Sequence, residues 1–131
     1  MAQHNLLGQA GEEAACRYLV RKGYRLRHRN WRCGHLELDI VAEWLGEIVF
    51  VEVKTRSHEG LVAPRESVTR TKRQHLLDAG AAYLAHHRLD LAPFRFDVIE
   101  VVGTAPPFAI RHMENAFTAR DGRSRSHPGL H

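Results

Sequence analysis

Residues Asp39–Arg56 read DIVAEWLGEIVFVEVKTR, and this stretch decides the fold. It contains two runs rich in β-branched and aromatic residues, which favour strands. The runs are separated at Leu45-Gly46, where a tight reversal of the chain needs a glycine. The pattern therefore predicts a β-hairpin.

The predicted hairpin brings charged side chains together. Because successive side chains point to opposite faces of a strand, Glu52 and Lys54 share one face. If the reversal is centred between Leu45 and Gly46, Asp39 lies directly across from Glu52. A slip of one residue would put the two acids on opposite faces. The symmetric register predicts two carboxylates and one ammonium on a small patch of sheet.

Two interpretations fit this cluster. Adjacent carboxylates repel each other, and burial penalises any charge that is not paired. A divalent cation such as Mg²⁺ or Mn²⁺ would relieve the repulsion between Asp39 and Glu52, with Lys54 orienting a water molecule or holding a phosphate. The alternative is a structural ion pair in which Lys54 bridges both acids on a solvated face. These three residues alone leave both interpretations open.

The motif also resembles a known signature. Asp39 followed by Glu52-Val53-Lys54 at the end of an apolar strand resembles the PD-(D/E)xK signature of restriction-endonuclease-like nucleases. Further segments strengthen the likeness, namely Gly11-Glu12, Arg29-Asn30, the full run Val49–Arg56, and Arg95-Phe96-Asp97-Val98. Together they resemble the YraN-like family of uncharacterised bacterial proteins over about residues 6–117. That family is similar in layout to Holliday-junction resolvases.

The resemblance implies a mixed α/β fold with a restriction-endonuclease-like αβββαβ core. It implies a Mg²⁺ (or Mn²⁺) site held by Asp39 and Glu52, with Lys54 as a catalytic residue and Glu12 completing the site. The implied reaction is hydrolysis of phosphodiester bonds in nucleic acid. DNA is the first candidate substrate, including branched or junction DNA. The resemblance to resolvases also implies a homodimer that reaches two strands. A non-catalytic nucleic-acid-binding module with the same fold and a structural adaptor are the rival functions.

The charge balance is compatible with a nucleic-acid partner. Lysine and arginine number 19 against 15 acids, which gives a net charge of +4. Arginine, the better residue for bidentate phosphate contacts, dominates the cations. We expect phosphate contacts from seven cations: Arg25, Arg27, Arg29, Arg56, Arg70, Lys72 and Arg73. The alternative is that these charges are solvated or paired with neighbouring acids.

Periodicity places the remaining elements. A helix is predicted over 6–22 with Asn5 as N-cap and Gly23 as its C-terminal stop. A strand at 24–31, a helix at 68–87 and strands at 94–102 and 108–113 follow. The segment 57–67 is expected to be a loop. We expect one domain over residues 1–117 and a disordered basic tail over 118–131.

Other classes of protein are disfavoured. The sequence lacks an early apolar run typical of a signal peptide and any stretch of about 20 apolar residues. The expected location is therefore the cytoplasm, without a membrane partner. Cys16 and Cys33 lack the spacing of a zinc site or disulfide framework. The ten histidines match no standard ligand template.

Overall fold

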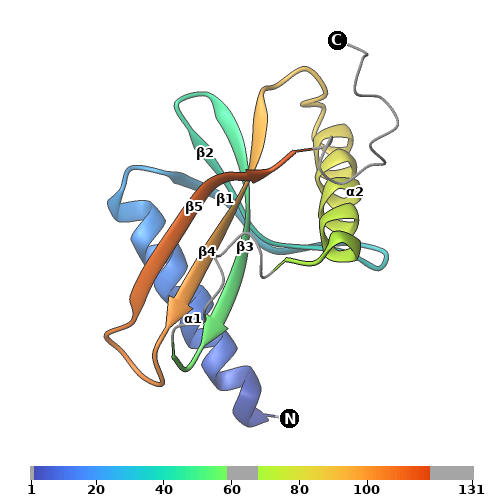
Figure 1. The fold of residues 1–131 in the computed structure, drawn as a ribbon. Helices are drawn as coiled ribbons and strands as arrows, with labels where there is room; N and C mark the ends of the chain where they lie inside the picture. Colours follow the sequence, from blue (N-terminus) through green and yellow to red (C-terminus); the bar gives the residue numbers. More distant parts are fainter. Residues whose placement is uncertain (1, 59–67, 119–131) are drawn as a thin grey trace.

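The protein is a five-stranded sheet with one helix on each face, as seen in a computed structural model that describes residues 2–58 and 68–118 (Figure 1). Its elements are α1 Ala2–Arg21, β1 Arg25–Cys33, β2 Leu36–Trp44, β3 Glu47–Arg56, α2 Arg70–His86, β4 Phe94–Val102 and β5 Ala109–Phe117. This confirms the predicted mixed α/β fold. No helix in the described part of the chain is long and apolar enough to cross a bilayer.

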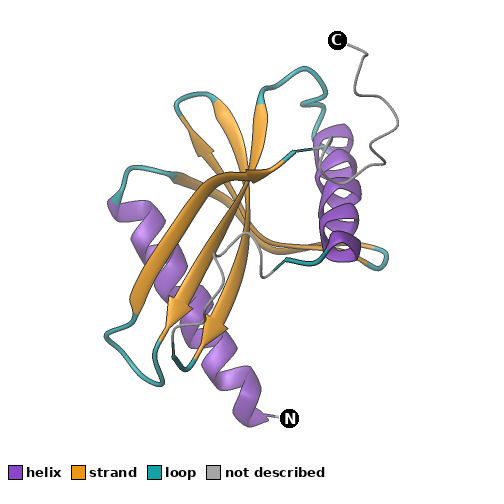
Figure 2. Cartoon of the chain, viewed as in Figure 1, coloured by secondary structure: helices purple, strands orange, loops and turns teal. Residues whose placement is uncertain are grey.

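The strands follow one another across the sheet in the order β1-β2-β3-β4-β5. All neighbours are antiparallel except β3 and β4, which are parallel. A parallel pair needs a long crossover connection, and α2 supplies it between β3 and β4. The first six elements therefore give the predicted αβββαβ core, and β5 extends the sheet at its far edge (Figure 2).

The hairpin of β2 and β3 has the predicted symmetric register. Pairing runs from Trp44↔Glu47 to Ile40↔Val51. Leu45 and Gly46 have φ of 51° and 85°, and two positive values in a two-residue loop match the twist of the flanking strands. Continued by one residue beyond Ile40↔Val51, the same register brings Asp39 opposite Glu52.

Each face of the sheet carries its own core. On one face α2 packs on residues that include Phe50, Phe96 and Val98. On the other face α1 packs through Ala15, Cys16 and Leu19 on residues that include Val49, Val51 and Ile99. The buried residues of α2 and of the segment just before it include Val68, Leu76, Ala79, Tyr83 and Leu84. The alternation along β3 therefore sends Glu52 and Lys54 toward the α2 face, and Val53 and Thr55 toward α1.

Several predicted boundaries were wrong. Helix α1 begins at Ala2, so Asn5 lies inside the helix and is not its N-cap. Helix α2 begins at Arg70, because Thr69 is the N-cap and accepts a hydrogen bond from the Lys72 N–H at 3.2 Å. Strand β5 continues to Phe117, which pairs with β4. Within the predicted loop and tail, residues 59–67 and 119–131 lie outside the described part of the chain.

Candidate active site

The candidate site lies where β2 and β3 separate. Past the Ile40↔Val51 pair, the Asp39 carboxylate takes the place of the next ladder acceptor, and its Oδ2 accepts a hydrogen bond from the Val53 N–H at 2.9 Å. The side chain of Asp39 is thereby fixed by the backbone of β3. This contact places it next to Glu52, as the register predicted.

The two acids disturb each other. Burial raises the pKa of Asp39 to about 7, the charge of Glu52 and a hydrogen bond with it add to the rise, and the Val53 N–H and Lys72 oppose it. A carboxyl with this pKa holds its proton near neutrality for part of the time. The pair therefore favours a proton or a cation between its oxygens.

Glu52 is the more deeply buried acid, with 7 % of its side chain exposed. Lys54 Nζ lies 3.6 Å from Glu52 Oε2, and Lys72 Nζ from the first turn of α2 lies 3.9 Å from the same oxygen. Among the described residues Lys54 makes no ion pair with Asp39. The structural alternative, in which Lys54 bridges both acids, is therefore not formed.

Glu12 reaches Asp39 from the other side of the sheet. Asn30 Nδ2 donates a hydrogen bond to Glu12 Oε1 at 2.8 Å, and Arg29 Nη2 lies 3.7 Å from that oxygen. Burial raises the pKa of Glu12 and the charge of Asp39 adds to the rise, while Asn30 and Arg29 oppose it. Its neighbour Glu13 instead pairs with Arg17 and Arg29, and its side chain is about half exposed.

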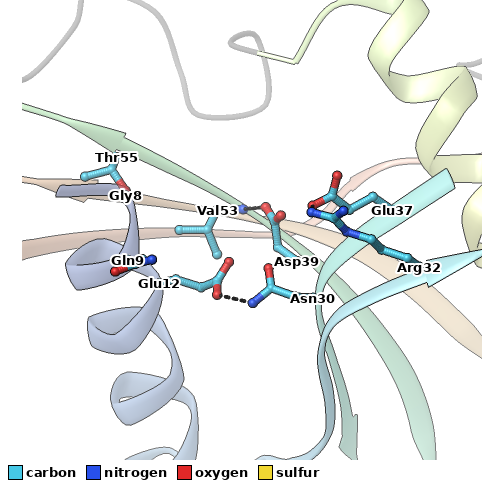
Figure 3. Close-up of a pocket in the computed structure, with 9 residues that line it drawn as sticks. All are labelled: Gly8, Gln9, Glu12, Asn30, Arg32, Glu37, Asp39, Val53 and Thr55. Atoms are coloured by element: carbon cyan, nitrogen blue, oxygen red, sulfur yellow. Dashed lines mark hydrogen bonds and ion pairs between the residues drawn. The ribbon is translucent and has the colours of Figure 1, made fainter. Parts of the chain in front are cut away.

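A polar cavity of about 540 Å³ opens on this side of the site (Figure 3). Figure 3 shows the Glu12 carboxylate turned toward Asn30 and the Asp39 carboxylate turned toward Val53. Nine residues line it: Gly8, Gln9, Glu12, Asn30, Arg32, Glu37, Asp39, Val53 and Thr55. Glu52 and Lys54 are not among them. The predicted catalytic residues therefore occupy two sides of one gap between strands, with Asp39 at the gap itself.

The donor set fits a hard divalent cation. Within residues 2–58 and 68–118, no group of three or more acidic, histidine or cysteine side chains is placed to hold a metal. Asp39 and Glu52 would thus supply two carboxylates and leave other coordination positions to water. Mg²⁺ commonly binds proteins in this way, through one or two carboxylates, retained waters and substrate phosphates.

The predicted phosphate contacts on β1 are paired with acids. Arg25 forms an ion pair with Glu43, and Arg27 pairs with the same glutamate and donates to Tyr83 Oη. Arg29 contacts Glu12 and Glu13. A register shift between Leu26 and His28 turns Arg27 toward α2 while Arg29 faces α1. The structure therefore does not bring these three arginines together.

The other predicted cations lie on β3 and α2. Arg56 forms an ion pair with buried Glu100, and Arg73 Nε donates to the Val68 carbonyl at 3.1 Å. Lys72 pairs with Glu52. Arg70 is exposed and makes no ion pair with another described residue.

Two contacts were missed at the sequence level. Asn30 holds Glu12 from a left-handed backbone conformation (φ 53°), which asparagine tolerates better than most residues. The sequence signal for a role of Asn30 was the Arg29-Asn30 segment, which is part of the resemblance to the family. The contact of Lys72 with Glu52 depends on where α2 begins over the sheet, for which the local sequence carried no signal.

Comparison with known proteins identifies the family. Residues 11–101 match the model described as "Uncharacterised protein family UPF0102". The chain belongs to UPF0102. This confirms the predicted YraN-like family, and the matched range contains Glu12, Asp39, Glu52 and Lys54.

Curated UPF0102 proteins align along most of the chain. One from Phocaeicola vulgatus is 49% identical over 117 residues, covering 89% of this chain and 96% of the relative. Another from Bacteroides fragilis is 50% identical over the same length and coverage. A longer UPF0102 protein from Oleidesulfovibrio alaskensis is 48% identical over 102 residues, which is 50% of that relative.

Proposed function

We propose that the protein is a metal-dependent nuclease that hydrolyses phosphodiester bonds of DNA. The observation that supports this most is the apposition of Asp39 and Glu52 at the point where β2 and β3 separate, with Lys54 Nζ 3.6 Å from Glu52. Asp39 and Glu52 would hold Mg²⁺ or Mn²⁺. When bound, the ion would activate water and neutralise phosphate charge.

The chain's own residues have separate tasks in this proposal. Lys54 is one-third exposed beside Glu52, so its ammonium is available to stabilise negative charge that develops on the phosphate. The Val53 N–H fixes the Asp39 carboxylate, and Asn30 fixes that of Glu12. Glu12 completes the acidic side of the gap or contributes to a second ion site.

One observation favours a second candidate, a nucleic-acid-binding module without catalysis. Glu52 already has two ammonium groups within 4 Å, from Lys54 and Lys72, so its charge is compensated without a metal. In such a module the lysines would bind phosphate and the acids would serve only to position them. The two candidates differ in whether removal of a carboxylate abolishes a reaction.

Cleavage assays separate these candidates. Wild type is tested with Mg²⁺ and Mn²⁺ on junction, flap, duplex, single-strand and RNA substrates, and then compared with Asp39→Asn, Glu52→Gln and Lys54→Ala. Each variant should lose at least about a hundredfold in rate, because one electrostatic contact at a reacting centre typically contributes ~2.7–4 kcal/mol. Metal-free binding should persist in the two acid variants, which only remove negative charge.

A matched pair on one helix controls for general effects. Glu12→Gln should lower cleavage, whereas Glu13→Gln, one residue along α1 and outside the cavity, should not. Tight binding by wild type without cleavage of any substrate would favour the binding module. Equal cleavage by wild type and Asp39→Asn would mean that the reaction occurs elsewhere or belongs to a contaminant.

A further inference from the structure

A row of charged residues crosses the α2 face of the sheet beside the candidate site. Lys54 on β3 pairs in register with Glu100 on β4, and Glu100 pairs with Arg111 on β5. Adjacent strands lie about 4.8 Å apart, so the row covers about 10 Å from β3 to β5. Arg56 lies two residues beyond Lys54 and points to the same face.

The acid of this row is buried and its cations are partly exposed. Glu100 has 0% of its side chain exposed and forms ion pairs with both Arg56 and Arg111, whose side chains are 35% and 34% exposed. The same arrangement occurs at the site, where Glu52 lies beneath Lys54 and Lys72. The charge presented to solvent along this surface is therefore positive.

Buried Glu100 holds Arg111 by a hydrogen bond and Arg56 by an ion pair. Arg111 Nη1 donates to Glu100 Oε1 at 3.0 Å, which fixes one edge of the guanidinium and leaves its other donors available. An arginine held in this way loses less conformational entropy on binding a phosphate than a free one. A fully buried carboxylate beneath two partly exposed arginines is thus a suitable support for a phosphate contact.

The opposite side of the site has the wrong charge for a phosphate backbone. Its cavity is lined by the acids Glu12, Glu37 and Asp39 and by one arginine, Arg32, which is paired with Glu37. The arginines of β1 are likewise paired with glutamates that are themselves partly exposed. On the α2 face, by contrast, Glu100 is fully buried and the partly exposed Arg56 and Arg111 lie above it.

We propose that Lys72, Lys54, Arg56 and Arg111 form a phosphate track that carries the nucleic-acid backbone over β3, β4 and β5 into the gap at Asp39. This inference rests on the proposed nucleic-acid function, and it adds the direction from which the nucleic acid approaches the site. Arg111, which the sequence did not single out, is the outer contact. The acidic cavity on the α1 side, lined by Glu12, Glu37 and Asp39, lies off this track.

Salt-dependent DNA binding tests the track. Binding of labelled duplex DNA is measured in EDTA from 50 to 200 mM KCl for wild type, Arg111→Gln and the control Arg17→Gln, an exposed arginine on α1. Arg111→Gln should flatten the log–log slope by about 0.9 and weaken binding roughly five- to tenfold near 0.1 M salt. Arg17→Gln should change neither.

A double variant controls for the change in net charge and for the loss of a partner by buried Glu100, both of which accompany Arg111→Gln. Glu100→Gln/Arg111→Gln leaves the net charge of the protein unchanged and avoids burying Glu100 with one partner fewer. It should still show the flattened slope, because the contact and not the total charge is lost. Thermal melting checks that each variant is folded.

The opposite pattern overturns the track. Unchanged slopes in both Arg111 variants, with a flattened slope in Arg25→Gln, would place the nucleic acid on β1. If Lys54→Ala also lost cleavage in that case, the proposed function would stand while the track fell. Absence of DNA binding by wild type would overturn both.

Discussion

At the scale of single residues, Asp39 links the fold to the proposed chemistry. Its carboxylate replaces a ladder acceptor for the Val53 N–H and at the same time faces Glu52. Burial and the second carboxylate together raise its pKa to about 7 from an ordinary value of 3.8. In the metal-free protein the carboxylates of Asp39 and Glu52 therefore repel each other, and a bound proton or divalent ion would remove this repulsion.

This repulsion predicts a pH dependence of stability. Below pH 3.8 Asp39 is protonated in both the folded and the unfolded chain. Between pH 3.8 and 7 only the unfolded chain loses the proton, so the contribution of Asp39 to stability is lost as the pH rises. In EDTA, the melting temperature of wild type should fall relative to Asp39→Asn from pH 4.5 to 7.5, since each unit of pKa shift corresponds to about 1.4 kcal/mol. Parallel curves for the two proteins would show that Asp39 is not perturbed.

The residue pairs of the site were predictable only where local pattern determines them. The opposition of Asp39 and Glu52 was predicted from the Leu45-Gly46 turn and the period of a strand, and the hairpin has the symmetric register that this prediction requires up to Ile40↔Val51. The hydrogen bond from Asn30 to Glu12 joins residues on different elements, and Asn30 has a positive φ inside β1. Strand periodicity carries no information about such a contact.

At the scale of elements, the close approach of α1 to β3 sets the position of Glu12. A Cβ on Gly11 would lie 2.1 Å from Thr55 Oγ1, so only glycine permits this packing. Gly8, one turn earlier on the same helix, has nothing within 4 Å of a built Cβ. The two glycines therefore provide a matched comparison.

We predict opposite effects of alanine at these glycines. Gly11→Ala should lower the free energy of unfolding by about 1–3 kcal/mol through overpacking, whereas Gly8→Ala should raise it by up to about 1 kcal/mol through helix propensity. Thr55→Ala removes the nearest atom, so in that background Gly11→Ala should cost less. Urea unfolding of the four variants measures this, and a harmless Gly11→Ala would refute the close packing.

The elements themselves were predicted unevenly. Strand β4 has the predicted bounds of Phe94 and Val102 because a proline precedes it and its residues strongly favour strands. The start of α1 was wrong because the residues before Asn5 also permit a helix, so the capping preference of asparagine did not decide the boundary. The end of β5 at Phe117 is set by pairing with β4, which is a tertiary effect.

At the scale of the whole molecule, the two layers of helix divide the site between the faces of the sheet. Helices α1 and α2 cover opposite faces of the sheet (Figure 1). Glu12 belongs to α1, whereas Glu52, Lys54 and Lys72 lie on the face covered by α2, and Asp39 lies in the gap between β2 and β3. A net charge of +4 is compatible with an anionic partner but carries no information about which face of the sheet would meet it. The position of Arg111 depends on the register of β5, which composition does not reveal.

Anomalous diffraction from crystals soaked in Mn²⁺ is a direct test of the proposed binding of a divalent ion by Asp39 and Glu52. We expect an anomalous peak at coordination distance from oxygens of both carboxylates in wild type and no peak in Asp39→Asn. Metal-free carboxylates at millimolar Mn²⁺, with Lys54 and Lys72 still the only charges paired with Glu52, would contradict it.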